Sequence, residues 1–231
     1  NCWDNEEGNR SHDLATELGY IPLYLTYNTG KAIASNGIDF ADKLESLLAA
    51  WPTPVTELII VGHSMGGLIT RSAYHHGEQK NHQWLSVTNT LVSLGSPHHG
   101  SPLERGGLVI EQLMSLSPYA IPYTRLTNIR SRGIGDLRFG SITHDQKEFV
   151  QLPSSVRYFA LAALLNKTPN AAAEKVVGDG LVPLDSAFGQ SSDTDRTLDI
   201  PSEHKWIGYG LGHNEMLCDE AVFSQVRKFL K

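Results

Sequence analysis

The chain has 231 residues, 40% of them hydrophobic, so it is long enough to bury a core as one large domain. Its formal net charge of −6 and its lack of basic clusters argue against a nucleic acid or an anionic membrane as the main partner. No apolar run reaches the length of a transmembrane helix, and no signal peptide is visible, so the sequence leaves the compartment open.

The ends of the chain raise two expectations. The chain begins with Asn1 rather than methionine, and no apolar strand precedes Leu18. We therefore expect it to begin inside a longer gene product, through processing or truncation, with amino-terminal strands missing. The two cysteines, Cys2 and Cys218, do not make a disulfide framework, and they could pair only if the fold brought the termini together.

The first part of the chain predicts a helix, a strand and a second helix. Residues 12–18 are typical of the end of a helix that Gly19 stops. Residues 20–27 are rich in aromatic and aliphatic side chains and predict a strand. From residue 38 to 51 the apolar positions follow a helical period, and Pro52 ends that helix.

The next stretch predicts a nucleophile. The apolar run 57–61 indicates a strand buried on both faces, Gly-His-Ser-Met-Gly-Gly follows it, and an amphipathic helix comes next. So tight a turn from strand to helix strains the backbone at the serine and leaves no room for side chains at Gly62 and Gly66. We predict that Ser64 is a nucleophile raised above the sheet edge. The alternative is a serine with a structural role in the turn.

A further strand is predicted over residues 90–94. The alternation of strands and helices indicates a parallel sheet with helices on both faces. Such sheets bind ligands at the carboxyl ends of their strands, where Ser64, His98 and His99 are all expected to lie. We interpret the two histidines as part of the wall of a substrate pocket rather than as catalytic groups.

Residues 103–150 interrupt this alternation with apolar and proline-containing segments. A helical insertion at the mouth of such a sheet predicts a cap or lid, whose apolar residues Leu108, Leu113 and Met114 would line the pocket. The alternative is that the insertion only covers a sheet edge. Residues 1–231 are otherwise predicted to form a single domain, with two more strands and a closing helix at residues 156–162, 205–209 and 219–230.

A serine hydroxyl is a weak nucleophile until a base removes its proton, and the base needs an acid to orient it. Among the ten histidines, His213 follows a predicted strand and so lies at the ligand-binding edge. His204 precedes that strand, and His63 is expected to point away from its neighbour across the tight turn. His213 is therefore the predicted base. The remaining candidates lie in polar surface stretches: His75, His76, His82 and His144.

The acid is expected between the serine and the histidine along the chain. Asp179 lies in a Gly-Asp-Gly turn that would present one carboxylate, and Asp185 is a weaker candidate six residues later. Three other carboxylates are interpreted as solvated loop charges: Asp193, Asp195 and Asp199. An oxyanion hole needs two backbone donors, and the N–H of Met65 is predicted to be one of them.

Four motifs together resemble the serine-dependent α/β-hydrolases: Val-Gly-His-Ser64-Met-Gly-Gly, Leu-Gly-Ser-Pro-His98-His99-Gly-Ser, Gly-Asp179-Gly-Leu-Val-Pro and Gly-His213-Asn-Glu-Met-Leu. The chain is most similar to bacterial lipases and esterases related to triacylglycerol lipases and to GPI inositol-deacylase-like enzymes. The resemblance implies an α/β-hydrolase fold with a helical cap, and a triad formed by the matching serine, aspartate and histidine.

The chain departs from the family pattern in two places. An upstream His-Gly dipeptide, which supplies the second oxyanion donor in the family, is absent, so the segment is missing or oxyanion stabilisation is impaired. Some relatives bind calcium through an aspartate two residues after the histidine, where this chain has Glu215. We therefore predict no metal site and no cofactor.

The predicted function is hydrolysis of a small-molecule or lipid carboxylic ester through an acyl-enzyme intermediate. A thioesterase or an acyltransferase would use the same residues. The alternative from another class is a catalytically silent hydrolase-fold module that binds a partner or a lipid. The natural substrate, its chain length, the motion of the cap and the oligomeric state stay open.

Overall fold

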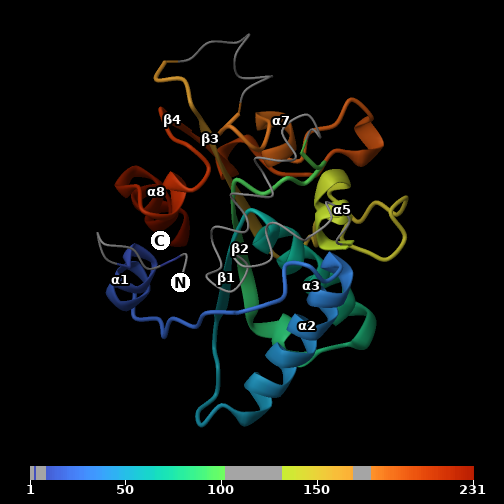
Figure 1. Ribbon diagram of the computed structural model, residues 1–231. Helices are drawn as coiled ribbons and strands as arrows, with labels where there is room; N and C mark the ends of the chain where they lie inside the picture. The colour runs from blue at the N-terminus through green and yellow to red at the C-terminus, as the bar shows by residue number, and fades with distance from the viewer. Residues whose placement is uncertain (1–2, 4–8, 102–131, 169–177) are drawn as a thin grey trace, which may run out of the picture.

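The computed structural model describes residues 3, 9–101, 132–168 and 178–231 (Figure 1). Its centre is a four-stranded sheet in the order β1-β2-β3-β4, and every neighbouring pair is parallel. The strands are β1 Leu58–His63, β2 Thr88–Leu94, β3 Arg157–Leu164 and β4 Lys205–Tyr209. Parallel pairing places all four carboxyl ends at one edge of the sheet, and the loops that carry the candidate site residues leave from there.

Helices cover both faces of this sheet (Figure 1). One face packs against α1 Arg10–Glu17 and α8 Glu220–Leu230, and the other against α2 Ile33–Ala50, α3 Met65–Lys80 and α5 Arg132–Phe139. Neighbouring strand residues point to opposite layers, so Tyr158 packs with the α2 and α3 cluster and Phe159 with the α1 and α8 cluster. This two-sided burial explains why the strands read as continuous apolar runs.

The remaining regular elements are short. They are α7 Leu184–Ala187 and the 3₁₀ turns η1 Gln83–Val87, η4 Thr194–Arg196, η5 Ser202–His204 and η6 Glu215–Leu217. The strands predicted from the apolar runs at 57–61, 90–94, 156–162 and 205–209 are all confirmed. The closing helix is confirmed as well, with the Asp219 carboxylate accepting from the N–H groups of Ala221 and Val222 as its amino-terminal cap.

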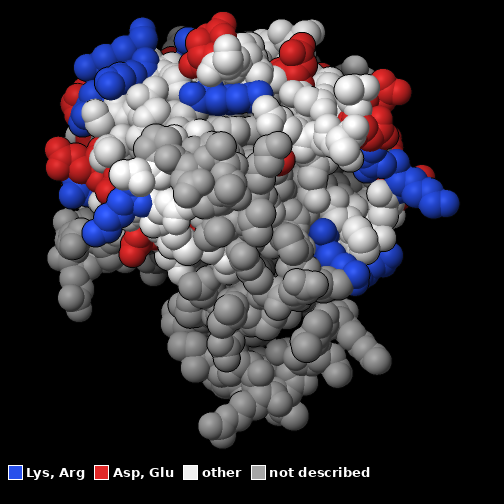
Figure 2. All heavy atoms as spheres, turned by 90° about the horizontal axis from the view of Figure 1, so that it is seen from above, with Lys and Arg blue, Asp and Glu red and all other residues white. Residues whose placement is uncertain are grey.

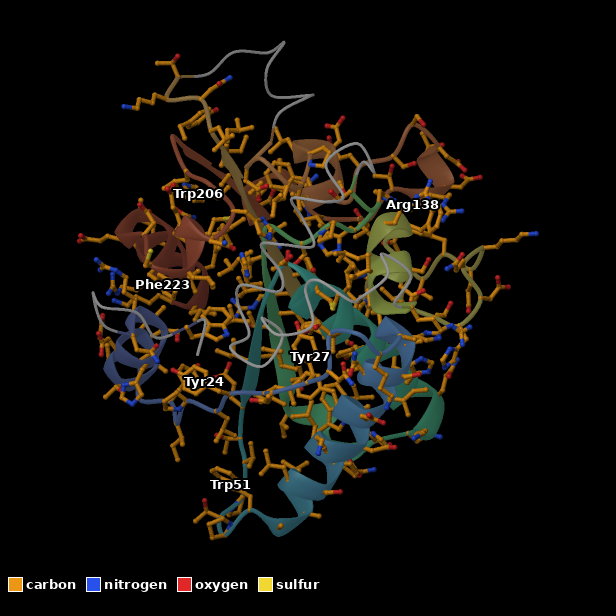
Figure 3. The ribbon with its side chains drawn as sticks, viewed as in Figure 1. Tyr24, Tyr27, Trp51, Arg138, Trp206 and Phe223 are labelled. Atoms are coloured by element: carbon orange, nitrogen blue, oxygen red, sulfur yellow. The ribbon has the colours of Figure 1, made fainter. Side chains whose placement is uncertain are left out.

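The two ends of the described chain lie side by side (Figure 1). The Arg227 guanidinium of α8 donates to both carboxylate oxygens of Glu17 in α1, at 3.0 Å from Nε to Oε1 and 2.8 Å from NH2 to Oε2. Trp206 of β4 and Phe223 of α8 lie on this same side of the sheet (Figure 3). Cys2 lies outside the described residues, so whether it pairs with Cys218 stays an open question.

The strand predicted over residues 20–27 is wrong. These residues form an extended connection between α1 and α2 with no ladder hydrogen bonds, and Figure 3 shows Tyr24 and Tyr27 on it. Ile21 is 70% exposed and Leu23 57% exposed, which shows that neither side chain packs in a core. β1 pairs only with β2 among the described strands, and an apolar alternation becomes a strand only when a neighbour completes its hydrogen bonds.

The helix predicted from residue 38 begins five residues earlier, at Ile33. The Ile33 N–H donates to the buried Asp136 carboxylate at 3.0 Å, and Asp136 belongs to α5, about a hundred residues along the chain. A helix start capped from so far away leaves no local signal in the sequence.

The predicted cap is only partly described. Residues 103–131, which include Leu108, Leu113 and Met114, lie outside the described residues, so the cap stays a prediction. The described remainder contains α5, which contacts α2. Among the described helices, none combines the length and the apolarity that crossing a membrane requires.

Candidate active site

Ser64 lies in the turn between β1 and α3, with φ 53° and ψ −123°. Among the described residues other than glycine, only Ser64 and Asn81 have positive φ. The turn is fixed from both sides, because the Ser64 N–H donates to the Leu94 carbonyl at 2.9 Å and the Ser64 carbonyl accepts from Gly67 N–H at 3.1 Å. The structure therefore holds a serine with strained backbone at the carboxyl end of a buried strand, the position at which the sequence predicted a nucleophile.

The close approaches in this turn occur at Gly62, as the sequence predicted, and at Gly67 rather than Gly66. A Cβ atom at Gly62 would lie 2.6 Å from the Gly67 nitrogen, as expected, but no described atom lies within 4 Å of a Cβ at Gly66. A Cβ at Gly67 would lie 2.1 Å from Ser96 Oγ. The prediction for Gly66 is wrong because the close approach comes from the loop after β2, which the five-residue motif does not contain.

His213 and Asp179 form a buried pair, each 3% exposed. His213 Nδ1 lies 2.6 Å from Asp179 Oδ2, and the His213 backbone N–H donates to the Asp179 carbonyl at 3.1 Å. The second carboxylate oxygen accepts from the N–H groups of Leu181 at 3.0 Å and Val182 at 2.8 Å. A carboxylate only accepts, so His213 donates from Nδ1, and its Nε2 atom keeps a free lone pair.

That Nε2 atom is buried and has no hydrogen-bond partner within the described part of the chain. Ser64 Oγ therefore makes no hydrogen bond to it in this conformation; such bonds are often long or misaligned before substrate binds. The two residues are nevertheless neighbours through His63, whose ring centroid lies 4.6 Å from that of His213. The structure thus brings Ser64, His213 and Asp179 to one edge of the sheet.

Gly95, the first residue after β2, packs directly against this pair. A Cβ atom at Gly95 would lie 3.0 Å from Asp179 Oδ2 and 3.3 Å from His213 Cε1, and the backbone φ is +56°. Met216 lies against the same glycine, with its sulfur 3.2 Å from that Cβ position. The loop after β2 therefore packs directly against the His213–Asp179 pair.

His98 is fully engaged in a buried polar cluster. Its Nδ1 atom lies 3.4 Å from Arg71 NH1, which can only donate, and its Nε2 atom lies 3.1 Å from the Tyr158 hydroxyl. Burial holds the pKa of His98 well below its usual value, lowers the pKa of Arg71 to about 10 and raises that of Tyr158 to about 12. Because both ring nitrogens of His98 are occupied, it offers a substrate no free polar atom.

Arg71 and Tyr158 were not anticipated from the sequence. Arg71 is 5% exposed and has no acidic partner among the described residues; its NH2 group donates to the Val150 carbonyl at 2.6 Å. The available signal was its position three residues after Leu68, on the buried face of α3.

His99 lies beside α7, the short helix that follows the acid loop, which is the turn that carries Asp179. The Nε2 atom of His99 lies 2.9 Å from the Gly189 carbonyl, just after α7, and its ring stacks on Phe149 at a centroid distance of 6.1 Å. Ser186 of α7 also bonds to the loop after β2, because its hydroxyl donates to the Gly100 carbonyl at 2.6 Å and accepts from His99 N–H at 3.2 Å. These contacts hold α7 against the loop after β2.

Met65, the predicted oxyanion donor, is the first residue of α3 and is 1% exposed. The first N–H groups of a helix have no intrahelical acceptor and carry the positive end of its dipole, so they suit a developing negative charge. The Glu215 carboxylate, at the position where some relatives bind calcium, accepts from Gly212 N–H at 2.7 Å. Among the described residues, no group of three or more His, Cys, Asp or Glu side chains could hold a metal ion.

Figure 2 looks onto the molecule from above, the side toward which the strands run. Lys and Arg side chains and Asp and Glu side chains are interspersed around the rim of the described surface. Neither the positively charged nor the negatively charged side chains form one continuous patch on this described surface.

The family model described as "PGAP1-like alpha/beta domain" matches residues 25–165. The chain belongs to this family. The match spans β1, α3, β2 and β3, and with them the turn that carries Ser64. The family and the architecture agree with the fold predicted from the sequence, the α/β-hydrolase fold.

A curated relative of this PGAP1-like chain is the GPI inositol-deacylase of Phaeosphaeria nodorum, 35% identical over 68 residues. That match covers 29% of this chain and 6% of the relative, so this chain corresponds to a small part of that protein. Among solved structures, the mature form of the Bacillus licheniformis lipase BlEst2 superposes with a TM-score of 0.60 at 20% identity, over 100% of this chain and 86% of that one. The metagenomic carboxyl esterase MGS0156 superposes with a TM-score of 0.54 at 18% identity, over 87% of this chain and 57% of that one.

Proposed function

We propose that this PGAP1-like domain hydrolyses carboxylic esters with Ser64 as nucleophile, His213 as general base and Asp179 as the acid that orients it. The observation that carries the proposal is the buried His213–Asp179 pair, whose Nε2 atom has no partner among the described residues, at the sheet edge where Ser64 is held at positive φ. The relative named a deacylase and the folds named lipase and esterase support the same reaction class.

In the first half of the reaction, Ser64 Oγ attacks the acyl carbon of the ester while His213 Nε2 takes the hydroxyl proton. The carbonyl oxygen becomes an oxyanion that the N–H of Met65 stabilises. The tetrahedral intermediate then collapses, the bond to the alcohol oxygen breaks, and His213 returns the proton to the leaving alcohol. The product of this half-reaction is an acyl ester on Ser64.

In the second half, His213 takes a proton from a water molecule, whose oxygen attacks the acyl carbon. The bond from that carbon to Ser64 Oγ breaks, the proton passes to Oγ, and the carboxylic acid leaves. Asp179 holds the proton of His213 on Nδ1 throughout, so Nε2 alternates between accepting and donating. Within the predicted cap, the apolar residues favour acyl chains of medium or greater length.

Two alternatives use the same fold. A thioesterase or an acyltransferase would form the same acyl-enzyme and differ in the leaving group or in the final acceptor. The name of the Phaeosphaeria nodorum relative also supports an acyl group on an inositol as a substrate class to test. A silent binding module would keep the fold but would not react at Ser64.

The test is covalent labelling of the intact chain with a fluorophosphonate, with the adduct mapped by mass spectrometry and Ser64→Ala as the control. Hydrolysis of p-nitrophenyl esters of two to sixteen carbons would then give the chain-length preference, with matched thioesters as a second series. We expect one adduct, on Ser64, and ester hydrolysis that Ser64→Ala abolishes. A folded wild-type protein that neither reacts at Ser64 nor cleaves any ester would overturn the proposal in favour of a silent module.

A further inference from the structure

His63 is the last residue of β1 and immediately precedes Ser64. It is 8% exposed, and its ring centroid lies 4.6 Å from that of His213 with the ring planes 42° apart. Its Nε2 atom lies 3.0 Å from the backbone oxygen of His213. The side chain thus points from the nucleophile strand to the loop that carries the predicted base.

The direction of this hydrogen bond follows from the acceptor. A backbone carbonyl can only accept, so His63 must donate from Nε2–H. Burial, the largest cause, lowers the pKa of His63 to about 3, so the ring is neutral in neutral solution and its Nδ1 atom carries no proton. His63 is therefore a neutral donor of fixed tautomer.

His213 has four polar atoms, and three of them are engaged. Its N–H donates to the Asp179 carbonyl and its Nδ1 to the Asp179 carboxylate, while its carbonyl accepts from His63. The Asp179 contacts fix His213 relative to the acid loop. Only the third contact comes from the strand that carries Ser64, and it is the one that relates the base to the nucleophile.

We propose that His63 is a positioning residue, whose Nε2–H holds the His213 backbone at a set distance from Ser64 so that His213 Nε2 faces the serine hydroxyl. The inference rests on the proposed function, because it assigns a role in the same reaction. A displacement of about 1 Å between a base and a nucleophile costs on the order of a hundredfold in rate. A neutral donor also adds no positive charge beside His213 when that ring takes up the serine proton.

The chain contains a matched control at the opposite end of the sheet. His204, just before β4, likewise engages a backbone oxygen, with Nδ1 3.1 Å from the Tyr158 carbonyl, and its ring centroid lies 4.3 Å from that of Phe159 at 45°. It shares with His63 a hydrogen bond to a backbone oxygen and a neighbouring aromatic ring, although it is only partly buried, and within the described part of the chain no contact links it to Ser64 or His213. Substitutions at His204 therefore measure how much stability the protein loses with such a histidine when the proposed active site is not affected.

The experiment compares His63→Gln, which keeps a donor near the position of Nε2, with His63→Met, which fills the space without a donor. His204→Asn and His204→Met are the corresponding controls. The measurements are kcat and KM for p-nitrophenyl butyrate, the rate of fluorophosphonate labelling at Ser64, and the midpoint of thermal unfolding. We expect His63→Met to lower kcat and the labelling rate by about 10- to 100-fold with KM changed by about twofold or less. His63→Gln should restore most of that loss, and the His204 variants should change only the unfolding midpoint.

Three results would overturn the inference: wild-type kcat in His63→Met, equal slowing in His63→Gln and His63→Met, or slowing of the His204 variants in proportion to lost stability. If His63→Met does not fold, ¹⁵N spectra of the wild-type imidazoles decide, because a proton on Nδ1 instead of Nε2 contradicts the contact. Those spectra need no catalysis. Failure of the proposed function shows separately, as a wild-type protein that fluorophosphonate does not label at Ser64.

Discussion

Asp179 holds His213 at two points, through its carboxylate at 2.6 Å from Nδ1 and through its backbone carbonyl at 3.1 Å from the His213 N–H. The other carboxylate oxygen accepts from the N–H groups of Leu181 and Val182. Asp179 Oδ1 therefore stabilises the acid loop, and Oδ2 orients the imidazole of His213. Because different oxygens do this, a mutation can remove the contact to His213 and keep the contacts within the loop.

Asp179→Asn is expected to keep the fold and lose the activity. The amide oxygen can still accept from Leu181 and Val182, but the amide nitrogen would then face His213 Nδ1 as a donor. The imidazole would have to accept there and carry its proton on Nε2, where it could no longer take the proton of Ser64. By analogy with aspartate-to-asparagine changes in serine triads, we expect kcat for a p-nitrophenyl ester to fall about 10³- to 10⁴-fold.

The matched control is Asp185→Asn, six residues along the same segment, where the carboxylate is exposed. This variant should retain wild-type kcat and unfolding midpoint. Equal losses in both variants, or an active Asp179→Asn protein, would contradict the assignment of Asp179.

Gly67→Ala should destabilise the protein, whereas Gly66→Ala should not. A Cβ at Gly67 would lie 2.1 Å from Ser96 Oγ and 2.8 Å from Ser96 Cβ, while none of the described atoms crowds one at Gly66. Overpacking of this kind costs about 1–3 kcal/mol, and Gly→Ala in an open helical position gains up to about 1 kcal/mol. Urea unfolding of the two variants measures the difference.

The cause of that cost can be tested by a second change. Ser96→Gly removes the two nearest of the three atoms that a Cβ at Gly67 would meet and leaves Ser93 Cβ at 3.3 Å, so the double variant should recover part of the stability that Gly67→Ala loses. Additive losses in the double variant would mean that the clash with Ser96 is not the cause.

Gly95→Ala is expected to disturb the predicted acid and base directly. The added Cβ would lie 3.0 Å from Asp179 Oδ2 and 3.3 Å from His213 Cε1. Gly19→Ala is the control, because its φ of +81° also lies in the left-handed region but its Cβ would meet no described atom within 4 Å beyond its chain neighbours, and it lies after α1, away from Asp179. We expect both variants to lose a similar amount of stability, but only Gly95→Ala to lower kcat, by at least tenfold. Similar kcat values in the two would argue that the pair tolerates the displacement.

Stability should fall as the solution becomes acidic, because the fold buries neutral histidines. Burial lowers the pKa of His63, which faces His213 and Asp179, to about 3. Burial also lowers the pKa of His98 well below its usual value; this ring faces Arg71, His99 and Tyr158. Their unfolded pKa is about 6.5, so below that pH the unfolded chain binds protons that the folded chain excludes. The stability is complete above pH ~6.5 and is lost toward lower pH.

Each such histidine contributes about 1.4 kcal/mol per pH unit in that window, so the pair predicts a loss of about 3–4 kcal/mol between pH 7 and pH 5. Urea unfolding at the two pH values measures it, and His63→Gln should remove about half of the change. A free energy of unfolding that is the same at pH 5 and pH 7 would show that these histidines titrate normally.

Much of the sheet could be predicted because its strands are buried on both faces and so read as short apolar runs. The turn at Ser64 could be predicted because glycines and a serine between a strand and a helix mark one particular backbone path. Asp179 and His213, 34 residues apart, could be proposed as partners because His213 follows a predicted strand and Asp179 lies in a Gly-Asp-Gly turn between the serine and the histidine along the chain. Their roles in catalysis remain predictions for the experiments above.

The sequence by itself determined the four strands of the sheet and the closing helix, since periodicity and turn residues act over a few positions. Only the tertiary structure decided that residues 20–27 form no strand, that Gly67 rather than Gly66 meets a neighbour, and that His63 contacts the His213 backbone. Each of these depends on a partner that lies far away in the chain. The local sequence pattern does not reveal a missing neighbouring strand, the side chain of Ser96 or a carbonyl 150 residues away.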